Sequence, residues 1–350
     1  MFNYTQLFLI FSVSFITVLI FTPFFISLAE KIGAVDKPSP RRVNIVPIAR
    51  LGGPVLFLAF VFSSPFYLTK LDSWLPITVG ALFMLTLGII DDLYGVNALW
   101  KLVWQIAVAV FMYLVGIRIE YLTKPFGDGG MIFPPDILSF FITVLWIVGI
   151  TNTLNLIDGL DGLAAGVTCI ASIALFLVAV EKAQAGSVYL AASMIGLSAG
   201  FLRWNFYPAK IFMGDSGSYF LGFMMSVIAI EGAFKSTLGL TFLIPVLVLG
   251  IPIFDTWFAI VRRLSSGKPV MGQPDRGHIH HRLLSAGWLH RDTVMLFYIM
   301  TLALGIFSLL LIRAWKLAML LVIAVLILIP VLIVSGKILK RRHREKVKDM

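Results

Sequence analysis

Polar residues that could do chemistry occur in four short motifs, each next to a long apolar segment. In chain order the motifs read DDLYG, NLIDGLDG, FMGDSGS and DRGHIHHRL. Carboxylate oxygens are ligands that Mg²⁺ prefers, and further carboxylates are suited to general acid–base work. A basic loop is suited to binding phosphate oxygens. Together the motifs predict metal-assisted chemistry on a phosphorylated substrate.

The first motif places two carboxylates side by side at the end of an apolar segment. Asp91 and Asp92 repel each other unless a cation compensates their charge, and Lys101 is the candidate cation. Two solvated carboxylates at a helix end are the alternative. Because ionised groups at the edge of a bilayer are costly, we interpret the pair as functional.

The second motif carries Asn155, Asp158 and Asp161 at every third position. On a helix these side chains would share one face, and Gly159 and Gly162 would let a ligand or a backbone approach closely. A glycine-rich segment for helix packing is the alternative. That alternative explains the glycines but not the two carboxylates, so the motif predicts a binding function.

In the third motif, Asp215 lies between Gly214 and Gly217, just before a new apolar segment. The glycines permit a tight turn, from which Asp215 would offer oxygen to Mg²⁺. An Asp or Ser cap on the next helix is the alternative, and the two roles are compatible. Phe212, just upstream, is either a core residue or a platform that stacks on a base.

The fourth motif is cationic and contains Arg276, His278, His280 and His281. Its spacing is weak evidence for zinc, which prefers Cys or three well-placed His and carboxylate ligands. The motif suits phosphate or sugar hydroxyls better. A structural role for the histidines is the alternative.

The composition places these motifs in a membrane protein. Of the 350 residues, 59% are hydrophobic and 13% charged, and the mean hydropathy is +0.96. An ordinary soluble domain is about 45–50% apolar and about 25% charged. A soluble enzyme and a disordered chain are therefore excluded, and the single Cys169 excludes a disulfide scaffold. The expected fold is an all-α polytopic integral membrane protein.

Apolar segments of about 20 residues predict membrane-spanning helices. The sequence predicts about eleven, at about 6–28, 51–69, 75–91, 101–117, 136–153, 163–180, 187–202, 217–231, 239–261, 293–312 and 317–337. Of the 28 Lys and Arg residues, 21 lie in the connections after odd-numbered spans and in the C-terminal tail. By the positive-inside rule, these connections and the tail are cytoplasmic and the N-terminus is outside.

A single domain, residues 1–350, is expected because no repeat or low-complexity linker divides the chain. Its basic tail, residues 338–350, is interpreted as a cytoplasmic anchor. A nucleic-acid partner is not expected, since no aromatic platform accompanies the basic residues. All four polar motifs fall on the expected cytoplasmic loops, at about 29–50, 91–101, 153–163, 203–216 and 262–292.

In this order and on these loops, the motifs resemble those of the polyprenyl-phosphate N-acetylhexosamine-1-phosphate transferase family. VDKPSPRRVNIVPIARLGG resembles that family's first cytoplasmic loop, so the resemblance covers about residues 30–290. The HIHH form is similar to the bacterial branch that uses UDP-GlcNAc. Gly95 stands where the family often has a third acidic residue, and Asn44 stands where it often has His.

The resemblance implies transfer of GlcNAc-1-phosphate from UDP-GlcNAc to undecaprenyl phosphate in the cytoplasmic membrane, with release of UMP. Mg²⁺ is the implied cofactor, with Mn²⁺ as a substitute, and a homodimer is an expectation at the level of the family. The product would feed a cell-envelope glycan. The lipid would enter through a groove near spans 5 and 9.

The resemblance also implies residue roles. Asp91 and Asp92 would act on the acceptor phosphate, with Asp91 as base or orienting group and Lys101 nearby. Asp215 would be the main Mg²⁺ ligand, with Asp161 as its partner. The uridine and diphosphate would be held by Asn155, Asp158, Asn205 and Phe212, among which Asp158 is also a candidate catalytic residue. The sugar-phosphate side would be bound by Arg276, His278, His280 and His281.

Two other functions remain open at this point. A sister transferase would use another UDP-HexNAc, such as UDP-GalNAc, or UDP-MurNAc-pentapeptide. A lipid or sugar transporter would typically show internal repeats and polar groups near the bilayer midplane, and neither is visible in the sequence. The polar groups lie instead at the ends of the predicted spans.

Overall fold

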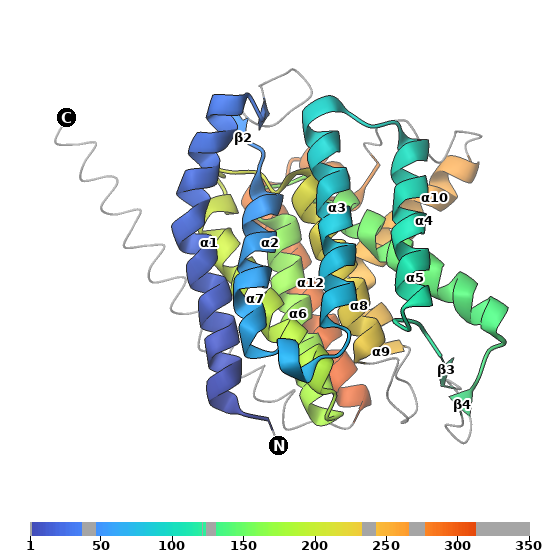
Figure 1. Ribbon diagram of the computed structural model, residues 1–350. Coiled ribbons are helices and arrows are strands. Elements are labelled where there is room, and N and C mark those ends of the chain that lie inside the picture. The colour runs from blue at the N-terminus through green and yellow to red at the C-terminus, as the bar shows by residue number, and fades with distance from the viewer. Residues whose placement is uncertain are drawn as a thin grey trace, which may run out of the picture.

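The computed structural model describes residues 2–36, 47–120, 122–123, 131–232, 243–265 and 277–312. These residues form a bundle of helices with two short two-stranded sheets (Figure 1). Arg276, Asn44, the expected span at 317–337 and the tail at 338–350 lie outside the described residues.

The described part of the chain is mainly helical. The helices are α1 (Tyr4–Ile32), α2 (Gly52–Ser63), α3 (Trp74–Tyr94), α4 (Ala98–Leu114), α5 (Asp136–Ile157), α6 (Leu163–Glu181), α7 (Ala185–Asn205), α8 (Gly214–Glu231), α9 (Leu243–Val248), α10 (Gly250–Ser265), α11 (Ile279–Ser285) and α12 (His290–Leu311). Two 3₁₀ turns, Ser64–Phe66 and Leu68–Lys70, follow α2. Antiparallel pairs join β1 (Val35–Asp36) to β2 (Ile48–Ala49) and β3 (Leu122–Thr123) to β4 (Met131–Ile132).

Several of these helices are suited to cross a membrane. Within the described residues, six are long and apolar enough, namely α1, α3, α5, α6, α7 and α12. Two shorter apolar helices cover 52–66 and 98–114. The expected multi-pass helical membrane protein is therefore confirmed. The total of eleven spans and their sidedness stay predictions.

One expected span is not a single helix. The segment predicted at 239–261 contains α9, which ends at Val248, and α10, which begins at Gly250. Pro252 explains the break, because its ring has no N–H and would clash with the carbonyl of Val248 in a continuous helix. In the first turn of α10 the same proline is tolerated.

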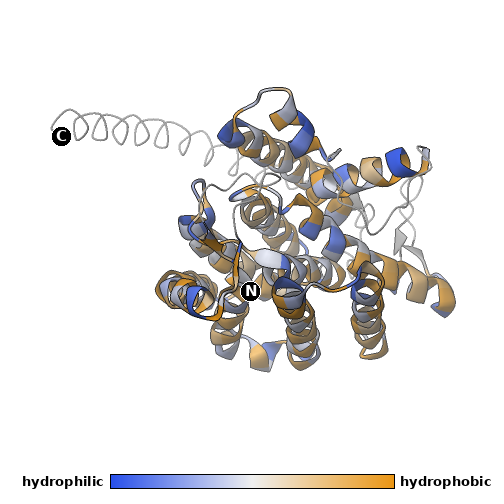
Figure 2. Cartoon of the chain, turned by 90° about the horizontal axis from the view of Figure 1, so that it is seen from above, coloured by the Kyte–Doolittle hydropathy of each residue, from blue (hydrophilic) through white to orange (hydrophobic). Residues whose placement is uncertain are grey.

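The interior and the outer surface of the bundle are both apolar. Nearly every residue of α8 is buried, and this helix packs mainly against α3 and α5 and also against α2. By contrast, α1 exposes Phe8, Ile16, Ile20 and Phe24. Figure 2 shows hydrophobic residues on outward faces of the bundle. An apolar outer surface of this kind is suited to contact with lipid.

Two glycines bring neighbouring helices close to the first turn of α8. A Cβ atom at Gly88 of α3 would lie 2.2 Å from Ser216 Cα, and one at Gly53 of α2 would lie 2.5 Å from Ser216 Oγ. Only a residue without a side chain fits such a contact. This packing brings Arg50, just before α2, and Asp92, near the end of α3, to the start of α8.

Gly88→Ala is expected to lower both stability and turnover, because the new methyl group would push α3 away from α8. Overpacking of this kind costs about 1–3 kcal/mol. Thermal unfolding in detergent and product formation would measure the two effects. Gly149→Ala on α5 is the matched control, because an added Cβ meets nothing within 4 Å there. Equal behaviour of the two variants would contradict the close contact.

Candidate active site

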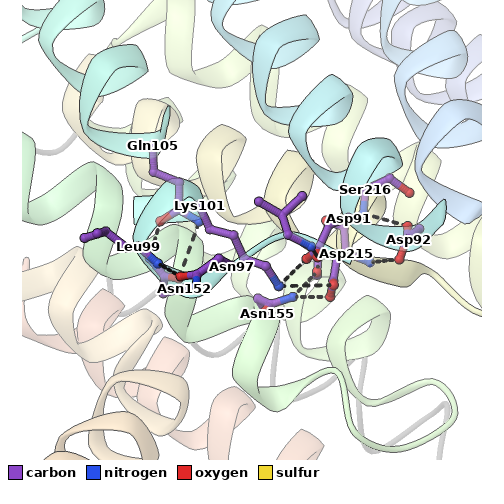
Figure 3. Close-up of polar contacts among 12 residues, drawn as sticks. Asp91, Asp92, Asn97, Leu99, Lys101, Gln105, Asn152, Asn155, Asp215 and Ser216 are labelled. Atoms are coloured by element: carbon purple, nitrogen blue, oxygen red, sulfur yellow. Dashed lines mark hydrogen bonds and ion pairs between the residues drawn. The ribbon is translucent and has the colours of Figure 1, made fainter. Parts of the chain in front are cut away.

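Polar residues from α3, α5 and α8 meet at one end of the bundle, although they are far apart in the sequence (Figure 3). Asp91 and Asp92 lie in the last turn of α3, Asn155 in the last turn of α5, and Asp215 in the first turn of α8. Figure 1 places the α3–α4 connection at the end of the bundle opposite the N-terminus. The first three sequence motifs therefore converge on one site.

Asp215 is held by one amide and faces two cations. Asn155 Nδ2 donates to Asp215 Oδ1 at 2.8 Å and to Ser218 Oγ at 2.8 Å. The other carboxylate oxygen, Oδ2, lies 3.5 Å from Arg50 Nη2 and 4.0 Å from Lys101 Nζ. The side chain is 23% exposed, so it is accessible from outside the protein. Asn155 thus orients the carboxylate and leaves the Oδ2 edge toward the cations.

Asp92 caps α8 from a neighbouring helix. Its two carboxylate oxygens accept from the backbone N–H groups of Asp215 at 2.9 Å and Ser216 at 3.1 Å. Arg50 Nε lies 3.0 Å from Asp92 Oδ1, and the Asp92 side chain is only 1% exposed. A carboxylate at this position satisfies orphan amides and complements the helix dipole. The cap expected from an Asp or Ser of the third motif therefore comes from Asp92, which positions Asp215.

Asp91 pairs with Lys101, as the sequence predicted. The Lys101 ammonium contacts Asp91 Oδ2, and the N–H of Val96 donates to Asp91 Oδ1 at 2.8 Å. The pair joins the end of α3 to the first turn of α4 across the connection at Gly95. Asp91 and Asp92, adjacent in sequence, are therefore compensated by different cations, Lys101 and Arg50.

Asp158 follows the last residue of α5 and lies between other carboxylates. Desolvation raises the pKa of Asp158 to about 8, and the charges of Asp215, Asp92 and Asp161 add to the rise. Asp215 contributes more to this rise than Asp161 does. A neutral or cation-bound Asp158 is thus favoured near pH 7, as expected of a carboxyl group that is buried among other carboxylates.

Asp161 and Asn205 connect backbone segments around the site. Asp161 Oδ2 accepts from the N–H of Ala209 at 2.9 Å. Asn205 accepts from the N–H of Gly162 at 3.0 Å and donates to the carbonyl of Ile211 at 2.8 Å. Because α5 ends at Ile157, the expectation that residues 155, 158 and 161 share one helix face is wrong. The contacts of Asp161 and Asn205 explain how they hold the site together, and their roles toward metal and donor stay predictions.

The HIHH segment forms the start of α11 and packs against the second motif. His280 is 1% exposed, and a Cβ at Gly159 would lie 2.5 Å from its Nε2 atom. Burial lowers the pKa of His280 to about 3, and the nearby His281 adds to this fall, so the ring is neutral. The His280 ring lies 5.8 Å from that of His278 and 4.3 Å from that of His281. Gly159 therefore makes room for a histidine, which no spacing argument predicted.

An aspartate from α10 orients the first histidine. Asp255 Oδ2 lies 2.8 Å from His278 Nδ1, and Asp255 Oδ1 accepts from the N–H of Ile279 at 2.7 Å. The carboxylate therefore requires a proton on Nδ1 and fixes the ring orientation. An ionisable residue within an apolar segment is the signal that could have identified this role from sequence.

Asp255→Asn is expected to reduce kcat/KM for the expected nucleotide-sugar donor by about 10–100-fold, the cost of losing a group that orients a metal-ligating histidine in other enzymes. The amide oxygen of the new Asn can still accept from the N–H of Ile279. Its NH₂ group then faces His278 Nδ1, and it cannot accept the proton on that nitrogen. Steady-state kinetics with varied donor would measure the loss. Asp292→Asn, at an exposed position in the first turn of α12, is the matched control. Similar kinetics for both variants would contradict the role of Asp255.

Of the other predicted site residues, Phe212 is described by the structure and Arg276 is not. The backbone of Phe212 joins the third motif to β2 and α2, since its N–H donates to Ala49 at 2.8 Å and its carbonyl accepts from Gly52 at 3.1 Å. Its side chain is half-buried, and base stacking stays a prediction. Arg276 lies outside the described residues. Arg50 contacts two carboxylates of the site, but the sequence did not distinguish it from the other basic residues of its loop.

The site offers hard oxygen ligands in an open arrangement. The described residues contain no cluster of three or more His, Cys, Asp or Glu with the geometry of a complete metal site. Mg²⁺ usually binds one or two carboxylates and completes its shell with water and substrate phosphates. Asp215 is oriented by Asn155, and its charge interacts with Asp158. This arrangement fits that chemistry.

Comparison with known protein families matches residues 74–233 to the family described as "Glycosyl transferase family 4". This segment runs from the start of α3 to the end of α8. It therefore contains Asp91, Asp92, Lys101, Asp158 and Asp215, and ends before the histidine motif.

The chain is also similar to curated proteins over most of its length. It is 43% identical over 298 residues to "Probable undecaprenyl-phosphate N-acetylglucosaminyl 1-phosphate transferase" of Bacillus subtilis, covering 83% of this chain and 80% of the relative. It is 34% identical over 301 residues to "Decaprenyl-phosphate N-acetylglucosaminephosphotransferase" of Mycobacterium tuberculosis, covering 78% and 74%. It is 27% identical over 308 residues to "Undecaprenyl-phosphate alpha-N-acetylglucosaminyl 1-phosphate transferase" of Escherichia coli K12, covering 85% and 82%.

Proposed function

Because the chain belongs to glycosyl transferase family 4, we propose that it transfers GlcNAc-1-phosphate from UDP-GlcNAc to a polyprenyl phosphate such as undecaprenyl phosphate. UMP is the second product. The observation that carries this proposal is the convergence of Asp91, Asp158 and Asp215 with Lys101 and Arg50 at one end of a membrane-embedded bundle. Such a site suits a reaction between a soluble nucleotide sugar and a lipid.

Each group of residues has a task in this reaction. Asp215 would hold Mg²⁺, with Asp161, its expected partner, or Asp158 as a second ligand. Asn155 would keep the Asp215 carboxylate in place. The bound ion would neutralise the donor diphosphate and stabilise the charge that develops on the leaving phosphate. His278, oriented by Asp255, and the neighbouring His281 would bind the sugar-phosphate side of the donor.

The reaction needs positioning more than activation. An oxygen of the acceptor phosphate attacks the β-phosphorus of UDP-GlcNAc, the bond from that phosphorus to the bridging oxygen breaks, and UMP leaves with the electron pair. A phosphate monoester has a second pKa of about 6, so the acceptor is largely ionised near pH 7. Asp91, paired with Lys101, would orient the acceptor phosphate and take any remaining proton.

The active site would face the cytoplasm, where nucleotide sugars are made. The excess of Lys and Arg in the odd-numbered connections supports this orientation. The arrangement in Figure 1 is compatible with it, since the site and the N-terminus lie at opposite ends of the bundle. The N-terminus would then lie outside, in a chain that spans the cytoplasmic membrane.

Purified protein supplied with UDP-GlcNAc, Mg²⁺ and undecaprenyl phosphate is expected to release UMP and to form the lipid-linked sugar. Each reaction lacking one component should release none. Parallel reactions with UDP-GalNAc and UDP-MurNAc-pentapeptide would define the donor, and we expect UDP-GlcNAc to be preferred. Movement of a lipid or sugar across vesicles without UMP release would support a transporter instead.

A further inference from the structure

Arg50 lies between Asp92, which caps α8 from the end of α3, and Asp215, in the first turn of α8. Its Nε atom lies 3.0 Å from Asp92 Oδ1, and its Nη2 atom lies 3.5 Å from Asp215 Oδ2. The backbone around it is fixed, because the N–H of Arg50 donates to the carbonyl of Ala34 at 2.9 Å and the N–H of Gly52 donates to that of Phe212 at 3.1 Å. The guanidinium is therefore part of the built site.

The edge of Asp215 that Arg50 faces is the edge left for a metal ion. Asp215 Oδ1 already accepts from Asn155, whereas Oδ2 faces Arg50 and Lys101. The Asp91 carboxyl group also lies next to the Asp215 carboxyl group. Lys101 lies farther from Oδ2, at 4.0 Å, and is engaged by Asp91. A divalent ion that approaches Oδ2 therefore meets the positive charge of Arg50 first.

The guanidinium also has donors to spare and access to the outside. Arginine carries five N–H donors in a planar fork that matches two phosphate oxygens. The contacts with Asp92 and Asp215 use one edge of this fork, and the side chain is 29% exposed. An incoming diphosphate could thus draw the Nη groups away from Asp215 while Nε stays on Asp92.

We propose that Arg50 is an internal counter-ion of the site, which competes with the divalent metal for Asp215 Oδ2. When donor and metal bind together, the Arg50 guanidinium turns from Asp215 to the donor diphosphate. This role rests on the proposed function. It makes Arg50 a donor-binding residue that also couples the two binding events. Metal alone then binds weakly, and each ligand strengthens the binding of the other by the same factor.

Binding of Mn²⁺ to the full-length protein in nanodiscs, followed by electron paramagnetic resonance without substrates, would test the competition. Arg50→Gln is expected to bind Mn²⁺ about two- to fivefold more tightly than the native protein, the range expected for loss of a partly exposed charge interaction. Arg50→Lys, which keeps the charge, should bind Mn²⁺ as the native protein does. Arg203→Gln is the matched control, because Arg203 is exposed and lies over the Trp204 ring.

The second measurement repeats the titration with UDP-GlcNAc and no polyprenyl phosphate. UDP-GlcNAc should tighten Mn²⁺ binding in the native protein and in Arg203→Gln. In Arg50→Gln, the ratio of the Mn²⁺ affinities with and without UDP-GlcNAc should fall toward one. Thermal unfolding would verify that all variants are folded. Unchanged or weaker Mn²⁺ binding by folded Arg50→Gln would overturn the inference and leave the proposed function standing. A native protein that binds neither Mn²⁺ nor UDP-GlcNAc would contradict both.

Discussion

Asp215→Asn is expected to lower kcat by about 10³-fold or more, because loss of a Lewis-acid metal removes several kcal/mol of transition-state stabilisation. The amide keeps the shape of the side chain, and its oxygen can still accept from Asn155 Nδ2. Only the charge that would hold Mg²⁺ is lost. The variant should also need a higher Mg²⁺ concentration for its residual activity, which a titration of turnover against Mg²⁺ would measure.

Asp136→Asn is the matched control for this substitution, because Asp136 is exposed in the first turn of α5. Its turnover and its Mg²⁺ titration should equal those of the native protein. Near-normal turnover by Asp215→Asn, with an unchanged Mg²⁺ requirement, would remove Asp215 from the metal site.

Asp91→Asn is expected to reduce kcat by about 10²–10⁴-fold, the usual contribution of a positioned acid–base group. Part of the activity should return as the pH rises above the second pKa of the acceptor phosphate, about 6, because the ionised acceptor needs no base. The measurement is kcat as a function of pH for both proteins. A constant ratio of the two rates across the pH range would leave Asp91 a purely orienting role.

The contact between Asp91 and Lys101 allows a sharper test of whether they act as a unit. If they do, the double variant Asp91→Asn/Lys101→Gln should be little worse than the poorer single variant, since the effects of interacting residues do not add. Losses that add in free energy would show that the two residues act independently.

The single variant Asp91→Asn also tests whether the reaction passes through a covalent enzyme intermediate. Direct attack by the acceptor phosphate predicts no UMP release when enzyme and labelled UDP-GlcNAc are mixed without lipid. An Asp nucleophile would instead form a covalent sugar-phosphoryl enzyme. Stoichiometric UMP release with the label retained on the native protein, but not on Asp91→Asn, would replace direct attack with the covalent route. The pairing of Asp91 with Lys101 favours direct attack, because a compensated carboxylate is a weaker nucleophile.

Hydropathy and local motifs were sufficient to predict the class of protein and the location of its chemistry. The apolar segments are long enough to cross a bilayer, and they predicted a multi-pass membrane protein. The polar motifs at the ends of these segments predicted one common site. The pairing of Asp91 with Lys101 was also predictable, since both flank the same short connection. These features depend on residues close together in the chain, and so a single sequence contains them.

The division of labour within the site depended on tertiary packing. Asp92 caps α8 only because Gly88 and Gly53 let α3 and α2 approach its first turn. The same packing brings Arg50 to Asp215, and Asp255 of α10 lies beside His278 from a different part of the chain. Sequence spacing did not show that Asp92 caps another helix, and it placed Asp158 and Asp161 on one helix face. It failed there because a carboxylate's role depends on the backbone amides and cations that it meets, and those come from helices distant in the sequence.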